Sequence, residues 1–168
     1  ITVKLQSMLQ EHIGFISTRF AGTDGVSLET QKWAAVLERL GHKCFYFAGE
    51  CDRNSDQSHV TPEAFYRHPE IDKINQQAYS GSWTVTKEAR AAHPEIATLH
   101  KDFFSMYVRP PQMTRRVNEL KEYFKEQLYE FAHRFALELL VLENVVTIPL
   151  NLPLGLALTE FIAETGFP

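Results

Sequence analysis

The chain has 168 residues, of which 44% are hydrophobic and 23% are charged, and its formal net charge is −4. This composition is that of a globular protein, and the length suits a single domain with one sizeable core. Positive charges are scattered and form no basic stripe, which argues against nucleic acid as a partner. The two cysteines, Cys44 and Cys51, are too few for a disulfide framework and belong to no zinc or redox motif, so we expect a reducing, cytoplasmic location.

The first part of the chain predicts a βαβ unit. Residues 12–20 are expected to form a strand, residues 27–40 a helix with apolar residues on one face, and residues 43–48 a buried strand. Ser27 is the expected N-cap of the helix, and Gly41 is its expected stop. This order indicates two parallel strands joined by a right-handed crossover.

The middle of the chain has a different character. Residues 50–92 are polar and interrupted by proline and glycine, which predicts one or two short helices between strands and a brief strand at residues 81–86. The tetrapeptide His-Pro-Glu-Ile occurs at residues 68–71 and 93–96, and we interpret both copies as helix starts. We therefore expect one Rossmann-like domain, residues 1–168, with a polar helical insertion near residues 51–110.

The last part of the chain returns to strong periodicity. Residues 111–136 predict a long helix with one apolar stripe, residues 138–143 a buried strand, and residues 153–165 a helix ended by Gly166. The apolar stretches are broken by charged residues, asparagine or proline, so none is expected to span a bilayer. Alternating strands and helices predict an α/β fold with an open, mostly parallel sheet flanked by helices.

Ligands of such sheets bind beyond the carboxyl ends of the strands, and two loops meet that condition. The first contains Gly22, Thr23, Asp24 and Gly25 and directly precedes a helix N-terminus, where glycines and free N–H groups favour an oxygen-rich ligand. Its sequence is neither a P-loop nor a dinucleotide-binding motif. Asp24 is either an acceptor for sugar hydroxyls or a capping residue, and the spacing leaves both readings open.

The second loop follows the strand at residues 138–143. Asn144 and Asn151 flank it, and their amides suit the recognition of hydroxyl groups, although loop asparagines also commonly serve turns. Glu143 ends its strand and can accept hydrogen bonds or act as a base, and Glu50 follows the strand at residues 43–48 in a similar position. The histidines show no metal-ligand spacing and no G-x-S-x-G motif occurs, so we expect neither a metal site nor a nucleophile-elbow hydrolase.

Two stretches resemble a known family. The sequence IGFISTRFAGTDGVSLETQKWAAVLERLGHKCFYFAGE at residues 13–50 resembles the opening of the retaining glycosyltransferases of family four. The sequence ENVVTIPLNLPLGLALTEFIAETGFP at residues 143–168 is similar to a mid-domain segment of a bacterial subgroup of that family. The resemblance does not extend to residues 51–110. It implies the N-terminal half of a two-domain GT-B architecture, in which the active site lies between two Rossmann-like halves.

The resemblance also implies a reaction, namely sugar transfer from a nucleotide-sugar donor to an acceptor with retention and without a metal or other cofactor. It places residues 22–25 near the donor's phosphates, although this chain interposes Thr23 and Asp24 where paired glycines are commoner. The nucleotide itself would be held by a C-terminal domain outside this chain, so we expect the chain to be inactive alone. Two alternatives stay open: half of a sugar-nucleotide epimerase, and a non-catalytic module that binds a saccharide or a protein. Membrane contact of the parent protein has no support in the sequence.

Overall fold

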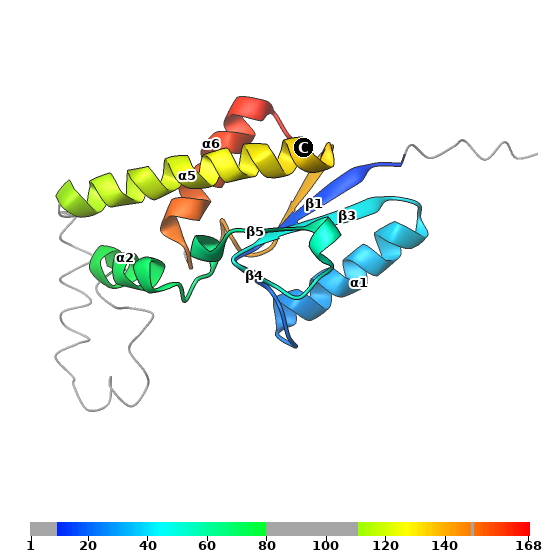
Figure 1. Cartoon of the computed structure of the whole chain (residues 1–168), viewed down its shortest axis with the longest axis horizontal. Helices are drawn as coiled ribbons and strands as arrows, with labels where there is room; N and C mark the ends of the chain where they lie inside the picture. The colour runs from blue at the N-terminus through cyan, green and yellow to red at the C-terminus, as the bar shows by residue number, and fades with distance from the viewer. Residues whose placement is uncertain (1–9, 80–110, 149) are drawn as a thin grey trace, which may run out of the picture.

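The computed structural model describes residues 10–79, 111–148 and 150–168. Its centre is a four-stranded parallel sheet with the strand order β5-β3-β1-β6. The four strands are β1 (His12–Ile16), β3 (Lys43–Ala48), β5 (Ser58–Val60) and β6 (Leu139–Leu142). Helix α1 (Gly25–Arg39) covers one face, while α5 (Pro111–Phe135) and α6 (Leu152–Thr165) cover the other (Figure 1). The predicted α/β class with a Rossmann-like parallel sheet is therefore confirmed.

Two apolar cores separate the layers, one on each face of the sheet. The larger core lies under α5 and α6 and contains fully buried residues such as Phe47, Phe124 and Phe161. The smaller core lies under α1 and contains Phe15 and Cys44. Because successive side chains of a strand point to opposite faces, β1 and β3 supply both cores at once. The two central strands are therefore largely buried.

Strand β1 is shorter than the sequence predicts. It ends at Ile16 rather than at residue 20, because Ser17 and Thr18 leave the sheet with their side chains buried. Arg19–Phe20 then forms a separate strand, β2, which pairs in parallel with β4 (Glu50–Cys51). The chain therefore leaves the main sheet at the carboxyl end of β1, where a ligand site is expected.

Helix α1 begins two residues before the predicted range. Its N-cap is Asp24, not Ser27, because the Asp24 carboxylate accepts a hydrogen bond from the Ser27 backbone N–H at 3.0 Å. Ser27 instead lies in the first turn, and its hydroxyl donates back to Asp24 at 2.8 Å. At the other end, Gly41 has a φ of 99°, which confirms the predicted glycine stop.

The long helix α5 has the predicted stripe. Its seven buried residues recur at intervals of three and four and face the sheet and α6: Met113, Val117, Leu120, Phe124, Leu128, Phe131 and Phe135. Gly14 of β1 permits this packing, because a Cβ there would lie 3.0 Å from the Phe131 ring and 2.6 Å from Leu137. The final helix α6 begins at Leu152, one residue before the predicted start, and ends at Gly166 with a φ of 69°.

The polar middle of the chain contributes more to the sheet than the sequence indicated. Strand β5 was missed, because three residues of the sequence Ser-His-Val are too short for a periodic pattern. Around it lie two 3-10 turns, η1 (Ser55–Gln57) and η2 (Pro62–Ala64), and then α2 (Pro69–Tyr79), which starts at the first His-Pro-Glu-Ile copy as predicted. The second copy at residues 93–96 and the expected strand at residues 81–86 lie outside the described residues.

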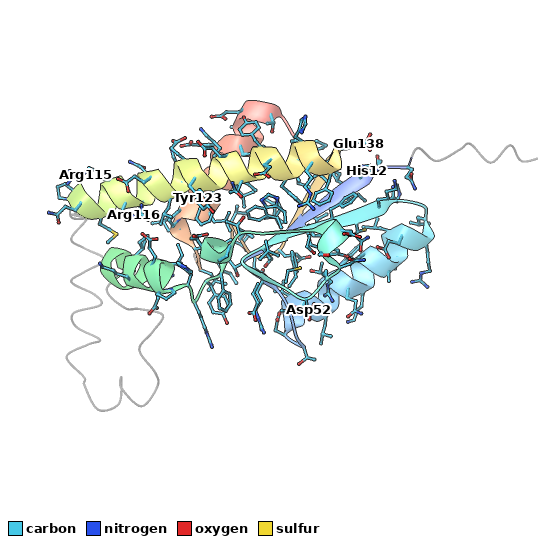
Figure 2. The ribbon with its side chains drawn as sticks, viewed as in Figure 1. His12, Asp52, Arg115, Arg116, Tyr123 and Glu138 are labelled. Carbon is cyan, nitrogen blue, oxygen red and sulfur yellow. The ribbon has the colours of Figure 1, made fainter. Side chains whose placement is uncertain are left out.

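The amino edge of the sheet is fixed by polar contacts across the first and last strands. The His12 backbone N–H donates to the Glu138 carboxylate at 3.0 Å, and the His12 ring nitrogen Nδ1 lies 2.6 Å from the Phe135 carbonyl oxygen. Figure 2 shows His12 and Glu138 close together at this edge. The opposite, carboxyl edge carries the candidate site.

Candidate functional site

The sheet has a topological switch point between β1 and β6. The connection from β1 through α1 to β3 runs over one face, and the connection from β6 into α6 runs over the other (Figure 1). Open α/β sheets bind ligands beyond the carboxyl ends of the strands at such a point. Here the point is bordered by residues 17–25, which follow β1, and residues 143–151, which follow β6. Both loops predicted as ligand-binding segments therefore lie at this edge.

The two loops are joined directly at the strand ends. The Ser17 hydroxyl donates to the Glu143 carbonyl oxygen at 3.1 Å, and the Glu143 N–H donates to the Ile16 carbonyl oxygen at 2.9 Å. Ser17 is only 4% exposed. These contacts hold the starts of the two loops next to each other at the strand ends.

The glycine loop is built around contacts of its own backbone. Gly22 has a φ of 75°, a conformation that favours glycine, and its N–H donates to the Asp52 carboxylate at 2.8 Å. Figure 2 labels Asp52 near the N-terminal end of α1, away from His12 and Glu138. Thr23 is exposed. At Gly25 a Cβ would meet no atom within 4 Å, so the space next to the first helical residue is open.

Asp24 occupies the position that an anionic ligand would take at this helix end. Burial alone would raise the pKa of Asp24, but the hydrogen bonds from Ser27 and the nearby Arg19 guanidinium outweigh it and lower that pKa. The carboxylate is therefore ionised at neutral pH and complements the positive end of the helix dipole. An incoming phosphate would have to compete with this built-in anion.

Arg19, which was not among the predicted site residues, brings a positive charge that neighbouring carboxylates balance. Its Nη1 lies 3.1 Å from the Asp24 carboxylate, and its Nε donates to Glu50 at 2.7 Å. The hydrogen bond to Glu50 raises the pKa of Arg19, which remains a cation. Because both sides of this guanidinium already face carboxylates, the loop offers no spare positive charge for a phosphate. The only sequence signal for the pair is that Arg19 and Glu50 follow neighbouring parallel strands.

Asn144 is the predicted site residue best placed for a ligand. It is exposed, its φ of 62° lies in the left-handed region, and its carbonyl oxygen accepts from Ile148. Within the described residues, its side-chain amide has no hydrogen-bond partner. A non-glycine residue in this backbone region at a strand end is a feature that often accompanies function.

Asn151, by contrast, is used by the fold. It is 2% exposed, and its Oδ1 caps α6 by accepting from the Leu154 N–H at 3.1 Å. Its Nδ2 donates to the carbonyl oxygens of Glu63 and Ala64 at 3.0 and 3.2 Å. The two asparagines that flank the loop therefore have different environments, and only Asn144 presents its amide to solvent.

Two carboxylates complete the polar side of the switch point. Glu143 follows β6, and partial burial together with the nearby Glu29 raises the pKa of Glu143. Glu29 lies in the second turn of α1, so α1 and β6 each bring one acidic group to this edge. A carboxylate at this position can accept hydrogen bonds from a hydroxyl-bearing ligand.

An apolar pocket of about 200 Å³ lies beside the polar groups. It is formed by the loop after β6 and the first turns of α6, and its apolar lining comes from Val145, Val146, Leu152 and Leu156. The sequence predicts no ligand role for these residues, since only the two asparagines that flank the loop suit the recognition of hydroxyl groups. The composition of the loop, Asn-Val-Val-Thr-Ile-Pro-Leu-Asn, was the available signal.

The parts of the chain that the structure describes lack two further features. There, no three His, Cys, Asp or Glu side chains are grouped so that they could hold a metal ion. In the same residues, no helix combines the length and apolar character needed to cross a membrane.

Comparison with known proteins gives no match: no family model, curated protein or solved structure is significantly similar to this chain. The fold and the site therefore define the class, an α/β protein with a Rossmann-like parallel sheet.

Proposed function

We propose that this chain binds the hydroxyl groups of a saccharide at the switch point between β1 and β6, as the acceptor-side half of a retaining glycosyltransferase. The observation that carries this proposal is the contrast between the two loops. The loop at residues 22–25 has its helix N-terminus filled by Asp24, whereas Asn144 presents an amide without a partner among the described residues. Such a site suits neutral hydroxyl groups better than phosphate.

This arrangement also supports a division of labour. A nucleotide-sugar carries two phosphates, and their binding calls for free N–H groups or cations. The described loops provide few of either, because Arg19 already contacts Asp24 and Glu50. In the proposed enzyme a second domain would hold the donor, and this half would position the acceptor, with catalysis by positioning and electrostatic stabilisation.

The proposal is tested by titrating the chain with methyl glycosides and, separately, with a panel of nucleotide-sugars. Binding is measured by calorimetry and by the shifts of backbone amide signals in NMR spectra. We expect a methyl glycoside to bind and to shift the amides of Gly25, Glu143 and Asn144. Tight binding of a nucleotide-sugar by the chain alone would contradict the division of labour. Lack of binding to every saccharide would contradict the proposed site.

Two variants sharpen this test. Asn144→Gly keeps the left-handed backbone conformation and removes only the amide, so we expect saccharide affinity to fall about tenfold with stability preserved. Asn118→Ala changes an exposed asparagine on α5 and is the matched control. For an enzyme that contains this chain, release of nucleoside diphosphate only with an acceptor supports transfer, and conversion of the donor sugar without one supports the epimerase alternative.

A further inference from the structure

The side chains that line the apolar pocket following Asn144 offer a ligand no free hydrogen-bond donor. Of its two polar lining residues, Thr159 donates its hydroxyl to the Gly155 carbonyl oxygen at 2.9 Å, and Asn151 has its amide bound within the fold. Water at this surface gains few hydrogen bonds from the protein, because most of the lining is apolar. Its lining therefore suits an apolar group.

A glycine and two exposed apolar side chains border the pocket. Gly155 lies in α6 where a Cβ would be 3.3 Å from the Val145 carbonyl oxygen, so the helix and the loop approach closely there. Val146 and Leu156 are 50% and 38% exposed, although both are large and apolar. Leaving this surface in water costs free energy, and a ligand that covers it would recover that cost.

The pocket is also adjacent to the proposed saccharide site. Val145, which lines the pocket, directly follows Asn144 in the chain, so their Cα atoms are about 3.8 Å apart. A ligand that reaches both residues would place a hydroxyl at the Asn144 amide and an apolar substituent in the pocket. A volume of about 200 Å³ corresponds to six or seven groups of roughly 30 Å³, the share of a water molecule in the liquid.

We propose that this pocket binds the alkyl group of the saccharide acceptor, so that the chain selects amphiphilic glycosides over free sugars. The inference rests on the proposed saccharide function and adds the class of acceptor. It follows from the position of the pocket next to Asn144, from its lining, and from the exposed side chains of Val146 and Leu156.

The test compares hexyl and methyl glucoside, both below the micelle-forming concentration, by calorimetry on the whole chain. A fully buried methylene is worth about fourfold in affinity, so even partial burial of the hexyl chain should give at least about tenfold tighter binding. In the double variant Val146→Asn/Leu156→Asn, hexyl and methyl glucoside should bind with about equal affinity. The affinity for methyl glucoside should be the same as in the wild type. Val60→Asn/Leu40→Asn is the matched control, because these residues are 50% and 49% exposed and lie outside the pocket.

A second measurement uses the wild-type chain and does not depend on the variants folding. Methyl NMR signals of Val146 and Leu156 should shift on addition of hexyl glucoside or 1-hexanol, and those of Val60 and Leu40 should not. Equal affinity for hexyl and methyl glucoside, or a hexyl gain that persists in the pocket variant, would overturn the pocket proposal and leave the saccharide function standing. Shifts with hexanol but no binding of any glycoside would overturn the saccharide function while supporting an apolar pocket.

Discussion

Asp24 closes the N-terminus of α1 by accepting two hydrogen bonds from Ser27. The Asp24 carboxylate accepts from the Ser27 backbone N–H at 3.0 Å and from the Ser27 hydroxyl at 2.8 Å. A side chain that caps a helix in this way satisfies a backbone donor that would otherwise be unpaired. The loop predicted to hold a ligand therefore first serves the stability of the helix that follows it.

Asp24→Ala should lower the free energy of unfolding by about 1 kcal/mol, because it removes this cap. The pKa of Asp24 is lowered in the folded protein, so its charge stabilises the fold above the ordinary value of 3.8, and the contribution is lost as pH falls through the lower folded value. Urea unfolding at pH 7 and at pH 2.5 would measure both effects. A destabilisation that is as large at pH 2.5 as at pH 7 would show that the charge is not its source.

Glu143→Gln should have the opposite effect and raise the free energy of unfolding at neutral pH. The pKa of Glu143 is raised by burial and by Glu29, so the ionised group opposes folding at neutral pH and its protonated form does not. We expect the variant to be more stable than the wild type at pH 7 by less than about 1 kcal/mol, since the site is partly solvated. The gain should vanish below the ordinary value of 4.5. Loss of stability at pH 7 would indicate a favourable partner for the Glu143 carboxylate.

Asn151→Ala tests whether this residue serves the fold rather than a ligand. The change removes the α6 cap and leaves the buried carbonyl oxygens of Glu63 and Ala64 without their donor. We expect a loss of roughly 2–4 kcal/mol, measurable by chemical denaturation. A stable variant that fails to bind saccharide would instead assign Asn151 to the ligand site.

Gly49 and Gly25 form a matched pair for steric effects. A Cβ at Gly49 would overlap the backbone of Ala64 and Phe65, whereas a Cβ at Gly25 would meet nothing within 4 Å. Gly49→Ala should therefore destabilise the chain by more than about 3 kcal/mol or prevent folding. Gly25→Ala should change stability by no more than about 1 kcal/mol. Thermal unfolding of the two variants would measure this difference in stability. Equal stabilities would show that η2 can move away from β3.

The interface between α5 and α6 separates charge from apolar packing. Lys125 contacts Glu160 and Glu164 at 3.3 and 3.0 Å, but these carboxylates are more than 40% exposed. Lys125→Ala should therefore change the free energy of unfolding little, because water and salt screen ion pairs of exposed groups. Leu128→Ala, at a residue that is 1% exposed on the same helix, should cost about 2–5 kcal/mol. The ranking is checked by urea denaturation at low and high salt, where only the effect of the lysine should weaken.

The sequence predicted the fold where one pattern is strong over many residues. The seven buried positions of α5 recur at helical spacing over 25 residues, and no other element could bury them on one side. β1 and β3 were found for the same reason. β5 escaped because its three residues owe their place to contacts distant in sequence, such as the His59 ring nitrogen at 3.0 Å from Gln127 of α5.

The candidate site was predicted only in part. That ligands bind at the carboxyl ends of strands follows from topology, so the two loops could be located without coordinates. The separate environments of Asn144 and Asn151 could not, because burial of Asn151 depends on carbonyl groups about 88 residues earlier in the chain. Arg19 was missed for a similar reason, since its partner Glu50 lies 31 residues away.

The pairing of β1 with β6 has a consequence for biosynthesis. Ile13 lies opposite Leu139, so β1 leaves the ribosome long before the strand that completes one of its two sides. At 5–20 residues per second, a separation of 126 residues corresponds to a delay of roughly 6–25 s. During that interval β1 can pair with β3, but its other edge and the apolar face that α5 later covers stay exposed. Nascent chains stalled before β6 has left the ribosome should therefore bind chaperones, and chains long enough to expose β6 should release them.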